Sequence, residues 1–238
     1  TVSSSSSAAE VYKGQDLYEL ASVGSVVDST IGDIRNADTL NTVVGTCKPD
    51  IIFHLAAQPL VRASFQDPVT TIETNVMGTV NILEAARESG STKAVVVITT
   101  DKCYENKEWN WGYRENEALG GHDPYSASKA CAELISQSWR LSFMGKSGND
   151  SHACAVATAR AGNVIGGGDW SADRLIPTIL NSISAAEDIV LRHPNAIRPW
   201  QHVLEPLAGY LMLAEKLFNE GSPWNEAWNF GPMDSDWL

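Results

Sequence analysis

The sequence predicts an α/β protein with a doubly wound parallel sheet. Short apolar runs, typical of buried strands, alternate along the chain with longer segments in which apolar residues recur at helical spacing. Small or polar residues follow the ends of several of these runs. Because strands that alternate with helices connect by right-handed crossovers, this order favours a parallel sheet that is covered on both faces.

The elements expected before residue 101 alternate regularly. In chain order they are a strand at 23–31, a helix at 37–47, a strand at 51–55, a helix at 68–89 and a strand at 94–100. The first helix stops before Lys48-Pro49, since a residue that precedes proline disfavours the helical conformation. The second helix carries apolar residues at helical spacing and ends at Gly90.

The second half of the chain is less regular. The expected elements are a helix at 126–143, a strand at 153–159, a helix at 174–185, a strand at 189–191 and a helix at 203–219. An irregular stretch opens at Gly166-Gly167-Gly168. We therefore divide the chain into an irregular, low-complexity edge at 1–22, an α/β domain at 23–165 and a smaller region at 166–238.

Composition excludes several classes of protein. The chain of 238 residues carries 29 acidic against 17 basic residues, whereas a nucleic-acid-binding domain usually has a basic face. It has no run of about 18 apolar residues, so we expect no membrane span. The four cysteines have no C-x-x-C spacing and no histidine cluster near them, which disfavours a disulfide framework or a metal site and favours the cytoplasm.

Three polar or small-residue segments follow consecutive expected strands. They are Leu55-Ala56-Ala57-Gln58, Thr99-Thr100-Asp101-Lys102 and Arg160-Ala161-Gly162-Asn163. Ligands of open parallel sheets bind beyond the carboxyl ends of the strands. Each segment alone reads equally well as an ordinary polar loop. Three of them at equivalent strand ends predict a ligand site.

Tyr125 and Lys129 are spaced to lie on one face of a helix. An ammonium beside a phenol lowers the pKa of the phenol, so such a tyrosine can act as a base near neutral pH. Taken alone, the spacing is more often that of a surface pair. The polar segments at the strand ends favour the catalytic interpretation.

The chain resembles the extended short-chain dehydrogenase/reductases, and among them the nucleotide-sugar 4,6-dehydratases. The motifs that carry the resemblance are Gly32-Asp33-Ile34-Arg35, His54-Leu55-Ala56-Ala57-Gln58, Thr74-Asn75-Val76-Met77-Gly78-Thr79, Thr100-Asp101-Lys102, Tyr125-x-x-x-Lys129 and Arg160-Ala161-Gly162-Asn163. Longer strings at 101–106, 111–116, 162–170 and 198–206 are most similar to the branch that acts on CDP-glucose. The branch that acts on dTDP-glucose has Asp-Glu where this chain has Asp101-Lys102.

The resemblance implies a Rossmann-like fold and an NAD-dependent lyase that converts CDP-D-glucose to CDP-4-dehydro-6-deoxy-D-glucose. Tyr125 would remove the proton of the C4 hydroxyl. Lys129 would lower the pKa of Tyr125, and Thr100 would orient the C4 oxygen. Lys102 would be the base at C5, and Asp101 would protonate the departing C6 hydroxyl.

The same resemblance implies binding residues. Those expected around NAD are Asp33, Ile34, Leu55, Ala56, Ala57, Asn75, Thr99, Tyr125 and Lys129, within the domain at 23–165. Those expected around the nucleotide sugar are Gln58, Asn163, Arg174, Arg198 and His202, most of them in the region at 166–238. Asn75 reads equally well as a residue that bridges backbone groups. The helix at 126–143 would pair subunits into a homodimer or homotetramer.

The chain departs from the family pattern at both ends. No G-x-x-G-x-x-G motif precedes Asp33, although in the family the backbone of this motif meets the pyrophosphate. The family's first two strands have no expected counterpart, so we expect a truncated chain with a gap in its sheet and poor NAD binding. The alternatives are another nucleotide-sugar dehydratase or epimerase of the family, or a non-catalytic remnant. Asp101-Lys102 argues against an epimerase, which eliminates no water.

Overall fold

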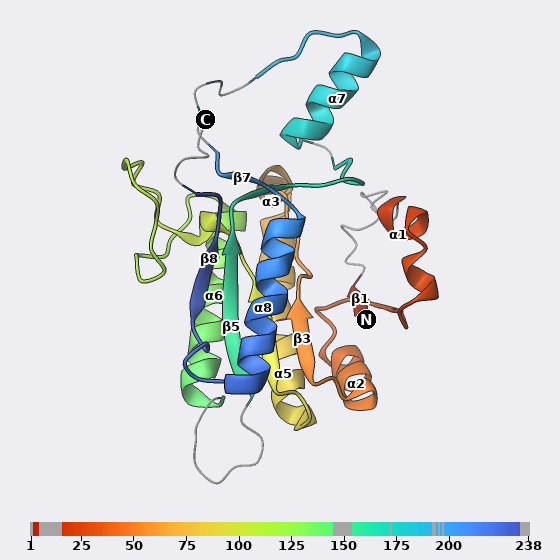
Figure 1. Ribbon diagram of the computed structural model, residues 1–238, viewed down its shortest axis with the longest axis vertical. Coiled ribbons are helices and arrows are strands. Elements are labelled where there is room, and N and C mark those ends of the chain that lie inside the picture. The colour runs from red at the N-terminus through yellow and green to blue at the C-terminus, as the bar shows by residue number, and fades with distance from the viewer. Residues whose placement is uncertain are drawn as a thin grey trace.

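A four-stranded parallel sheet forms the centre of the molecule. The computed structural model describes residues 2–4, 16–144, 154–171, 173–191, 194, 196 and 198–233. The strands lie in the order β3 (Ile51–His54), β4 (Ala94–Ile98), β5 (Ala155–Ala161) and β8 (Ala227–Phe230), all parallel (Figure 1). This confirms the α/β fold with a parallel sheet.

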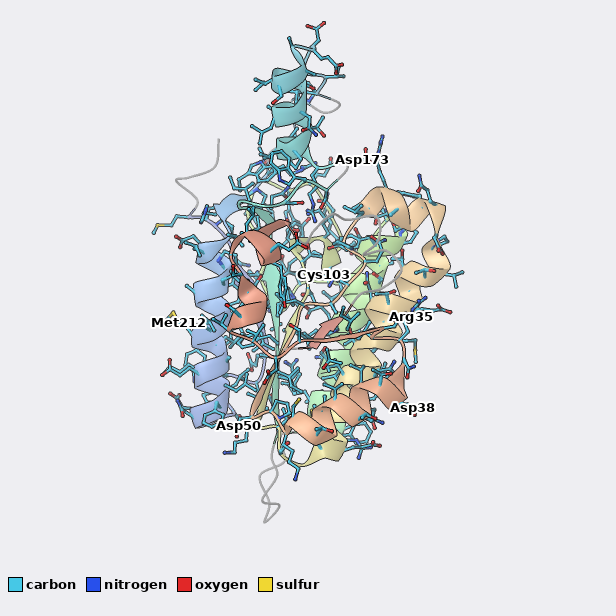
Figure 2. All side chains as sticks on the ribbon, turned by 90° about the vertical axis from the view of Figure 1, so that its right-hand side faces the viewer. Arg35, Asp38, Asp50, Cys103, Asp173 and Met212 are labelled. Carbon is cyan, nitrogen blue, oxygen red and sulfur yellow. The ribbon has the colours of Figure 1, made fainter. Side chains whose placement is uncertain are left out.

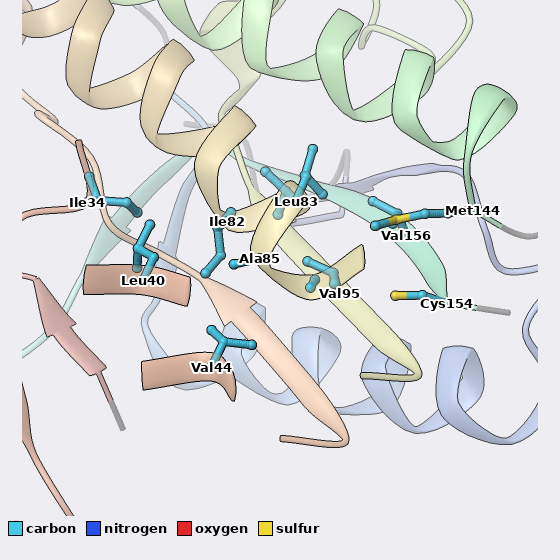
Figure 3. Close-up of a cluster of buried hydrophobic side chains, with 12 residues drawn as sticks. Ile34, Leu40, Val44, Ile82, Leu83, Ala85, Val95, Met144, Cys154 and Val156 are labelled. Carbon is cyan, nitrogen blue, oxygen red and sulfur yellow. The ribbon is translucent and has the colours of Figure 1, made fainter. Parts of the chain in front are cut away.

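Helices cover both faces of the sheet. The helices α5 (Gly78–Ser89) and α6 (Pro124–Ser142) pack on one face, and α8 (Leu204–Glu220) packs on the other (Figure 1). The core under α5 joins this helix to α2 (Ala37–Cys47) and to the strands (Figure 3). The labelled side chains of this core are Ile34, Leu40, Val44, Ile82, Leu83, Ala85, Val95, Met144, Cys154 and Val156.

Truncation of this core is expected to destabilise the protein. Leu83 is fully buried, so Leu83→Ala should lower the free energy of unfolding by about 2 to 5 kcal/mol, the usual cost of a leucine cavity. The matched control is Leu211→Ala on α8, because the Leu211 side chain is 63% exposed. Urea denaturation measures both changes. Equal losses for the two variants would contradict this account of the core.

Several shorter elements complete the chain. They are α1 (Asp16–Leu20), η2 (Val23–Ser25), α3 (Val61–Gln66), α4 (Pro68–Ile72), the π-helical η3 (Glu73–Met77), η4 (Asp101–Cys103), β6 (Asn163–Ile165), α7 (Leu175–Ala185) and β7 (Trp200–His202). The strands β6 and β7 pair in parallel as a small separate sheet. The helix α7 stands beyond the carboxyl edge of the main sheet (Figures 1 and 2).

The sheet has an open edge beside β3. The strands β1 (Val2–Ser4) and β2 (Thr30–Gly32) pair only with each other, in parallel, and no strand of the described part of the chain pairs with the outer edge of β3. The expected gap in the sheet is therefore present. The expectation of no strand before residue 23 is wrong, because β1 supplies one.

The boundaries of the other elements differ from expectation in particular places. The helix at 37–47 is confirmed, whereas the strand expected at 23–31 is formed only at 30–32. The helix expected at 68–89 contains the π-helical turn of η3, and 16–20, within the expected irregular edge, are helical. The strand expected at 189–191 is wrong, since these residues have no regular structure. None of the described helices is long and apolar enough to span a membrane.

Candidate active site

The carboxyl end of β4 and the first turn of α6 carry the candidate catalytic residues. Thr100 accepts a hydrogen bond from the Lys102 backbone N–H and so caps η4. On the facing element, the Asp123 carboxylate caps α6 at Ser126, and Pro124 starts the helix. These two caps place η4 next to the amino end of α6, where Tyr125 lies.

A series of contacts joins four of the five candidates. The Lys102 Nζ lies 3.0 Å from Asp101 Oδ1, and the Thr100 hydroxyl donates to the same oxygen at 2.9 Å. Thr100 also hydrogen-bonds with the Tyr125 side chain. An acid–base pair thus reaches the tyrosine through one threonine. Asp101 and Lys102 are about one-third exposed, at 35% and 38%, so a ligand can reach both.

The electrostatics of Tyr125 and Lys129 differ from the expectation. Burial raises the pKa of Tyr125 to about 12, and the hydrogen bond with Thr100 opposes this. Burial lowers the pKa of Lys129 to about 8, and its ammonium donates to the Ile98 carbonyl at 3.0 Å. The expected lowering of the Tyr125 pKa by Lys129 is not seen in this structure, in which the Ile98 carbonyl engages the ammonium, and the role of the pair stays a prediction.

A cavity of about 540 Å³ opens beside the acid–base pair. Its lining includes Asp101, Lys102, the aromatic rings of Tyr104 and Trp111, and Arg198. This volume lies within the range of small-molecule sites, about 300–1,000 Å³. The cavity thus combines two groups able to move protons with an arginine suited to a phosphate or carboxylate.

The other predicted substrate residues lie outside the lining of this cavity. Asn163 is in β6, and its Oδ1 is buried with no hydrogen-bond partner in the described part of the chain. Arg174 precedes α7 and pairs with Asp169 at 3.2 Å. His202 ends β7 and accepts from the Leu204 N–H at 3.3 Å. Arg198, in contrast, lines the same cavity as Asp101 and Lys102.

Gln58 and Asn75 form a buried structural bridge. The Asn75 amide accepts from the Gln58 backbone N–H at 2.8 Å and donates to the Gln58 carbonyl and to the Ser128 hydroxyl. The Gln58 side chain bonds with Leu60 and Thr71. The expectation that Gln58 faces the sugar is contradicted, because its side chain is buried and satisfied. For Asn75 the structure favours the bridging role.

The residues predicted around the cofactor fall into two groups. Arg35 binds the Asp33 carboxylate through both oxygens and lowers the pKa of Asp33. Ile34 is buried in the core, so the expected place of Ile34 beside an adenine is contradicted. At the end of β3, in contrast, Leu55 is 54% exposed. Ala56 and Ala57 follow it and are partly exposed.

Sequence reasoning missed a buried polar cluster under the site. The Glu133 carboxylate on α6 accepts hydrogen bonds from Thr99 and from Thr158 and pairs with Arg160 at 2.7 Å. Arg160 also donates to the Tyr104 hydroxyl at 2.7 Å. The spacing of Glu133, eight residues after Tyr125 on the same helical face, is a signal that could have identified it.

Comparisons with known proteins agree with this fold. A family model described as GDP-mannose 4,6 dehydratase matches residues 2–221. The chain is 53% identical over 220 residues to a CDP-glucose 4,6-dehydratase of Salmonella typhimurium. The aligned part covers 92% of this chain and 61% of that protein. It is 33% identical over 133 residues to a CDP-paratose 2-epimerase of Salmonella typhi, covering 50% of this chain and 39% of the epimerase.

Solved structures give the same result. A dTDP-glucose 4,6-dehydratase from Streptomyces venezuelae, crystallised with NAD, superposes with a TM-score of 0.74 at 25% identity, covering 90% of this chain and 62% of that one. The chain therefore spans about three-fifths of the length of these two dehydratases. Since the family model extends over most of the chain, this protein belongs to the GDP-mannose 4,6 dehydratase family.

Proposed function

We propose that this protein is an NAD-dependent lyase that converts CDP-D-glucose to CDP-4-dehydro-6-deoxy-D-glucose. The observation that carries the proposal is the series of contacts from Lys102 through Asp101 and Thr100 to Tyr125. It unites a residue suited to oxidation at C4 with an acid–base pair suited to loss of water from C5 and C6. The 53% identity to a CDP-glucose 4,6-dehydratase supports the choice of substrate.

The proposal gives each residue a step. Tyr125 takes the proton of the C4 hydroxyl, and Thr100 orients the C4 oxygen. The resulting 4-ketone acidifies the C5 proton, which Lys102 removes, and Asp101 protonates the departing C6 hydroxyl. Asp101 and Lys102 suit these roles because they line the cavity and because Lys102 Nζ donates a hydrogen bond to Asp101 Oδ1 at 3.0 Å. Arg198 in the same lining holds the diphosphate.

Tyr125 needs a positive charge beside it to act as a base. Its pKa of about 12 keeps the phenol neutral at pH 7. An ammonium within about 4–6 Å favours the phenolate, and Lys129 is one helical turn away on the same face. We propose that the Lys129 ammonium leaves the Ile98 carbonyl when substrate and cofactor are bound. It then lies beside the Tyr125 oxygen and hydrogen-bonds with the ribose of the cofactor.

The fit of the chain to NAD is partial. At the carboxyl end of β3, the small side chains of Ala56 and Ala57 leave the backbone open to a flat group. Lys129 offers a buried ammonium at the end of the neighbouring strand β4, where it donates to the Ile98 carbonyl. These residues fit the nicotinamide and its ribose. The chain has no G-x-x-G-x-x-G to meet the pyrophosphate, and the β3 edge has no neighbouring strand in the described residues. NAD, when bound, would accept a hydride from C4 and return it to C6.

We therefore expect weak NAD binding by these 238 residues. The physical reason is that helix-terminal and loop N–H groups normally supply much of the affinity for the pyrophosphate. Isothermal titration with NAD measures this directly. A dissociation constant in the micromolar range or below would contradict the expectation.

One assay tests the proposed activity. The protein is incubated with NAD in large excess and with CDP-glucose, and a 4-keto-6-deoxy product is detected by its ultraviolet absorbance in alkali. Parallel reactions with UDP-glucose and dTDP-glucose are the controls for the nucleotide part of the substrate. Turnover of these sugars but not of CDP-glucose would contradict the substrate assignment. Absence of turnover of every sugar by folded protein would favour a non-catalytic remnant.

The remaining parts of the proposal concern organisation and location. Residues 23–165 would form the cofactor-binding domain and 166–238 the substrate-binding region; the place of Arg198 in the cavity supports this division. Exposed apolar side chains on α6, such as Leu134 and Leu141, support pairing of subunits through this helix. We place the protein in the cytoplasm, which its four free cysteines support.

A further inference from the structure

We propose that Glu133 is a positioning residue that fastens α6 to the carboxyl ends of β4 and β5 and thereby holds Tyr125 and Lys129 in register with Thr100. The inference rests on the proposed function for the roles of those three residues. The mechanism above assigns Glu133 no proton transfer, and it does not line the cavity beside Asp101 and Lys102.

Both oxygens of the Glu133 carboxylate are engaged by the strands. Oε1 accepts a hydrogen bond from the Thr99 hydroxyl, directly after β4. Oε2 accepts from the Thr158 hydroxyl at 2.7 Å and from the Arg160 guanidinium at 2.7 Å, both on β5. The side chain is 3% exposed. One carboxylate therefore joins a helix to two neighbouring strands.

The position of this carboxylate relates it to the candidate catalytic residues. Tyr125, Lys129 and Glu133 follow one another at intervals of four residues along a single face of α6. Thr99, which Glu133 binds, is the residue before Thr100. A shift of α6 along the sheet would break the bond with Thr99 and move Tyr125 away from Thr100. The carboxylate thus sets the register between the two elements on which the chemistry depends.

Stability alone does not account for this cluster. A buried ion pair is costly to desolvate, and well-packed apolar side chains of the same volume usually stabilise a protein equally well or better. Glu133 and Arg160 are both nearly fully buried, at 3% and 4% exposure. Directional hydrogen bonds differ from apolar contacts in that they specify one arrangement of the elements they join. This difference favours a role in positioning.

Glu133 is also the charged neighbour of Lys129. The groups that face Lys129 are Glu133 on the same helix, Cys103 on η4, His54 on β3 and Tyr125 one turn earlier. Burial keeps the Cys103 thiol neutral, with its pKa raised to about 12, and the His54 imidazole neutral, with its pKa lowered to about 3. The negative charge of Glu133 opposes the effect of burial on Lys129. Removal of that charge should therefore lower the pKa of Lys129.

The test is the titration of the Lys129 ammonium in a Glu133→Gln variant. NMR of the lysine Cε monitors the titration, and a Lys129→Arg variant assigns the Lys129 signal. We expect the midpoint of Lys129 to fall by about one pH unit, because a neutral amide no longer favours the ammonium. The matched control is Glu220→Gln on α8, which removes an exposed carboxylate that is paired with Lys216. It should leave the midpoint unchanged.

A double variant, Glu133→Gln with Arg160→Met, covers the case in which the single variant does not fold. It removes both buried charges and should recover the melting temperature. The Lys129 midpoint should stay low, because Glu133 is the charged group that acts on Lys129, whereas the Cys103 thiol is neutral. With CDP-glucose, both variants should lose at least tenfold in kcat with a smaller change in KM. A Lys129 midpoint equal to that of the unsubstituted protein in the variant that folds would overturn the inference.

The lysine titration needs no turnover. If the unsubstituted protein converts no sugar but the midpoint falls as expected, the proposed function fails and the electrostatic link of Glu133 to Lys129 stands. If the unsubstituted protein is active and the folded Glu133→Gln variant keeps its kcat, the positioning role is wrong. The two failures are thus distinguished by separate measurements.

Discussion

A Tyr125→Phe variant is expected to lose about a hundred- to ten-thousand-fold in its turnover of CDP-glucose, the usual contribution of a positioned acid–base group. Phenylalanine keeps the ring and loses only the hydroxyl. Without that oxygen no group takes the proton of the C4 hydroxyl, so the first oxidation stops and neither NADH nor keto-sugar should appear. The rates of both are followed in one reaction.

Tyr210→Phe is the matched control for this variant. Tyr210 is buried to a similar extent, at 6% against 8% exposure, and burial likewise raises its pKa to about 12. It packs edge-on against Phe230 at 5.2 Å, on the α8 side of the sheet. Loss of its hydroxyl should leave turnover unchanged. Equal losses in the two variants would indicate a general effect of removing a buried hydroxyl and would contradict a catalytic Tyr125.

A Lys102→Met variant is expected to separate oxidation from elimination. Methionine keeps an unbranched side chain but cannot accept the C5 proton. Tyr125 and Thr100 are untouched, so C4 is still oxidised, and NADH should accumulate to a level near that of the bound cofactor. The keto-sugar product should fall by at least a hundredfold, as for loss of a general base. The absorbance of NADH and the alkaline absorbance of the product measure the two steps.

Lys93→Met controls for the removal of a lysine from an ion pair. Lys93 lies directly before β4 and pairs with Asp50 at 3.6 Å, at the edge of the sheet opposite to Lys102. This variant should form product at the normal rate without accumulation of NADH. A Lys102→Met variant that made product at the normal rate would show that another group removes the C5 proton.

The elements with strong local signals were predicted well. The apolar run at 94–98 forms a strand because such a run suits a parallel sheet buried on both faces, and 37–47 forms a helix between an Asn36 cap and the stop at Lys48-Pro49. The stretch at 189–191 is as apolar as a strand but has none of its structure. A strand needs a neighbour to pair with, and no local pattern tells whether one is present.

The partners of side chains were harder to predict than their positions. Spacing placed Tyr125 and Lys129 on one face of α6, as the structure has them, but not the ammonium of Lys129 on the Ile98 carbonyl. Likewise, a Gln58 that follows a strand reads as a ligand-facing residue, whereas its amide closes a bridge with Thr71. Each of these contacts joins residues more than ten positions apart.

By itself, the sequence determined the alternation of strands and helices and the presence of an acid–base pair directly after a buried strand, because period and order along the chain are local properties. Only the tertiary structure decided which polar groups that strand end meets. It brings Thr100 against Tyr125, Glu133 against Thr99 and Thr158, and Arg198 into the cavity of Lys102. The physical reason is that a buried polar group must find a partner, and packing of distant segments determines which partner is within reach.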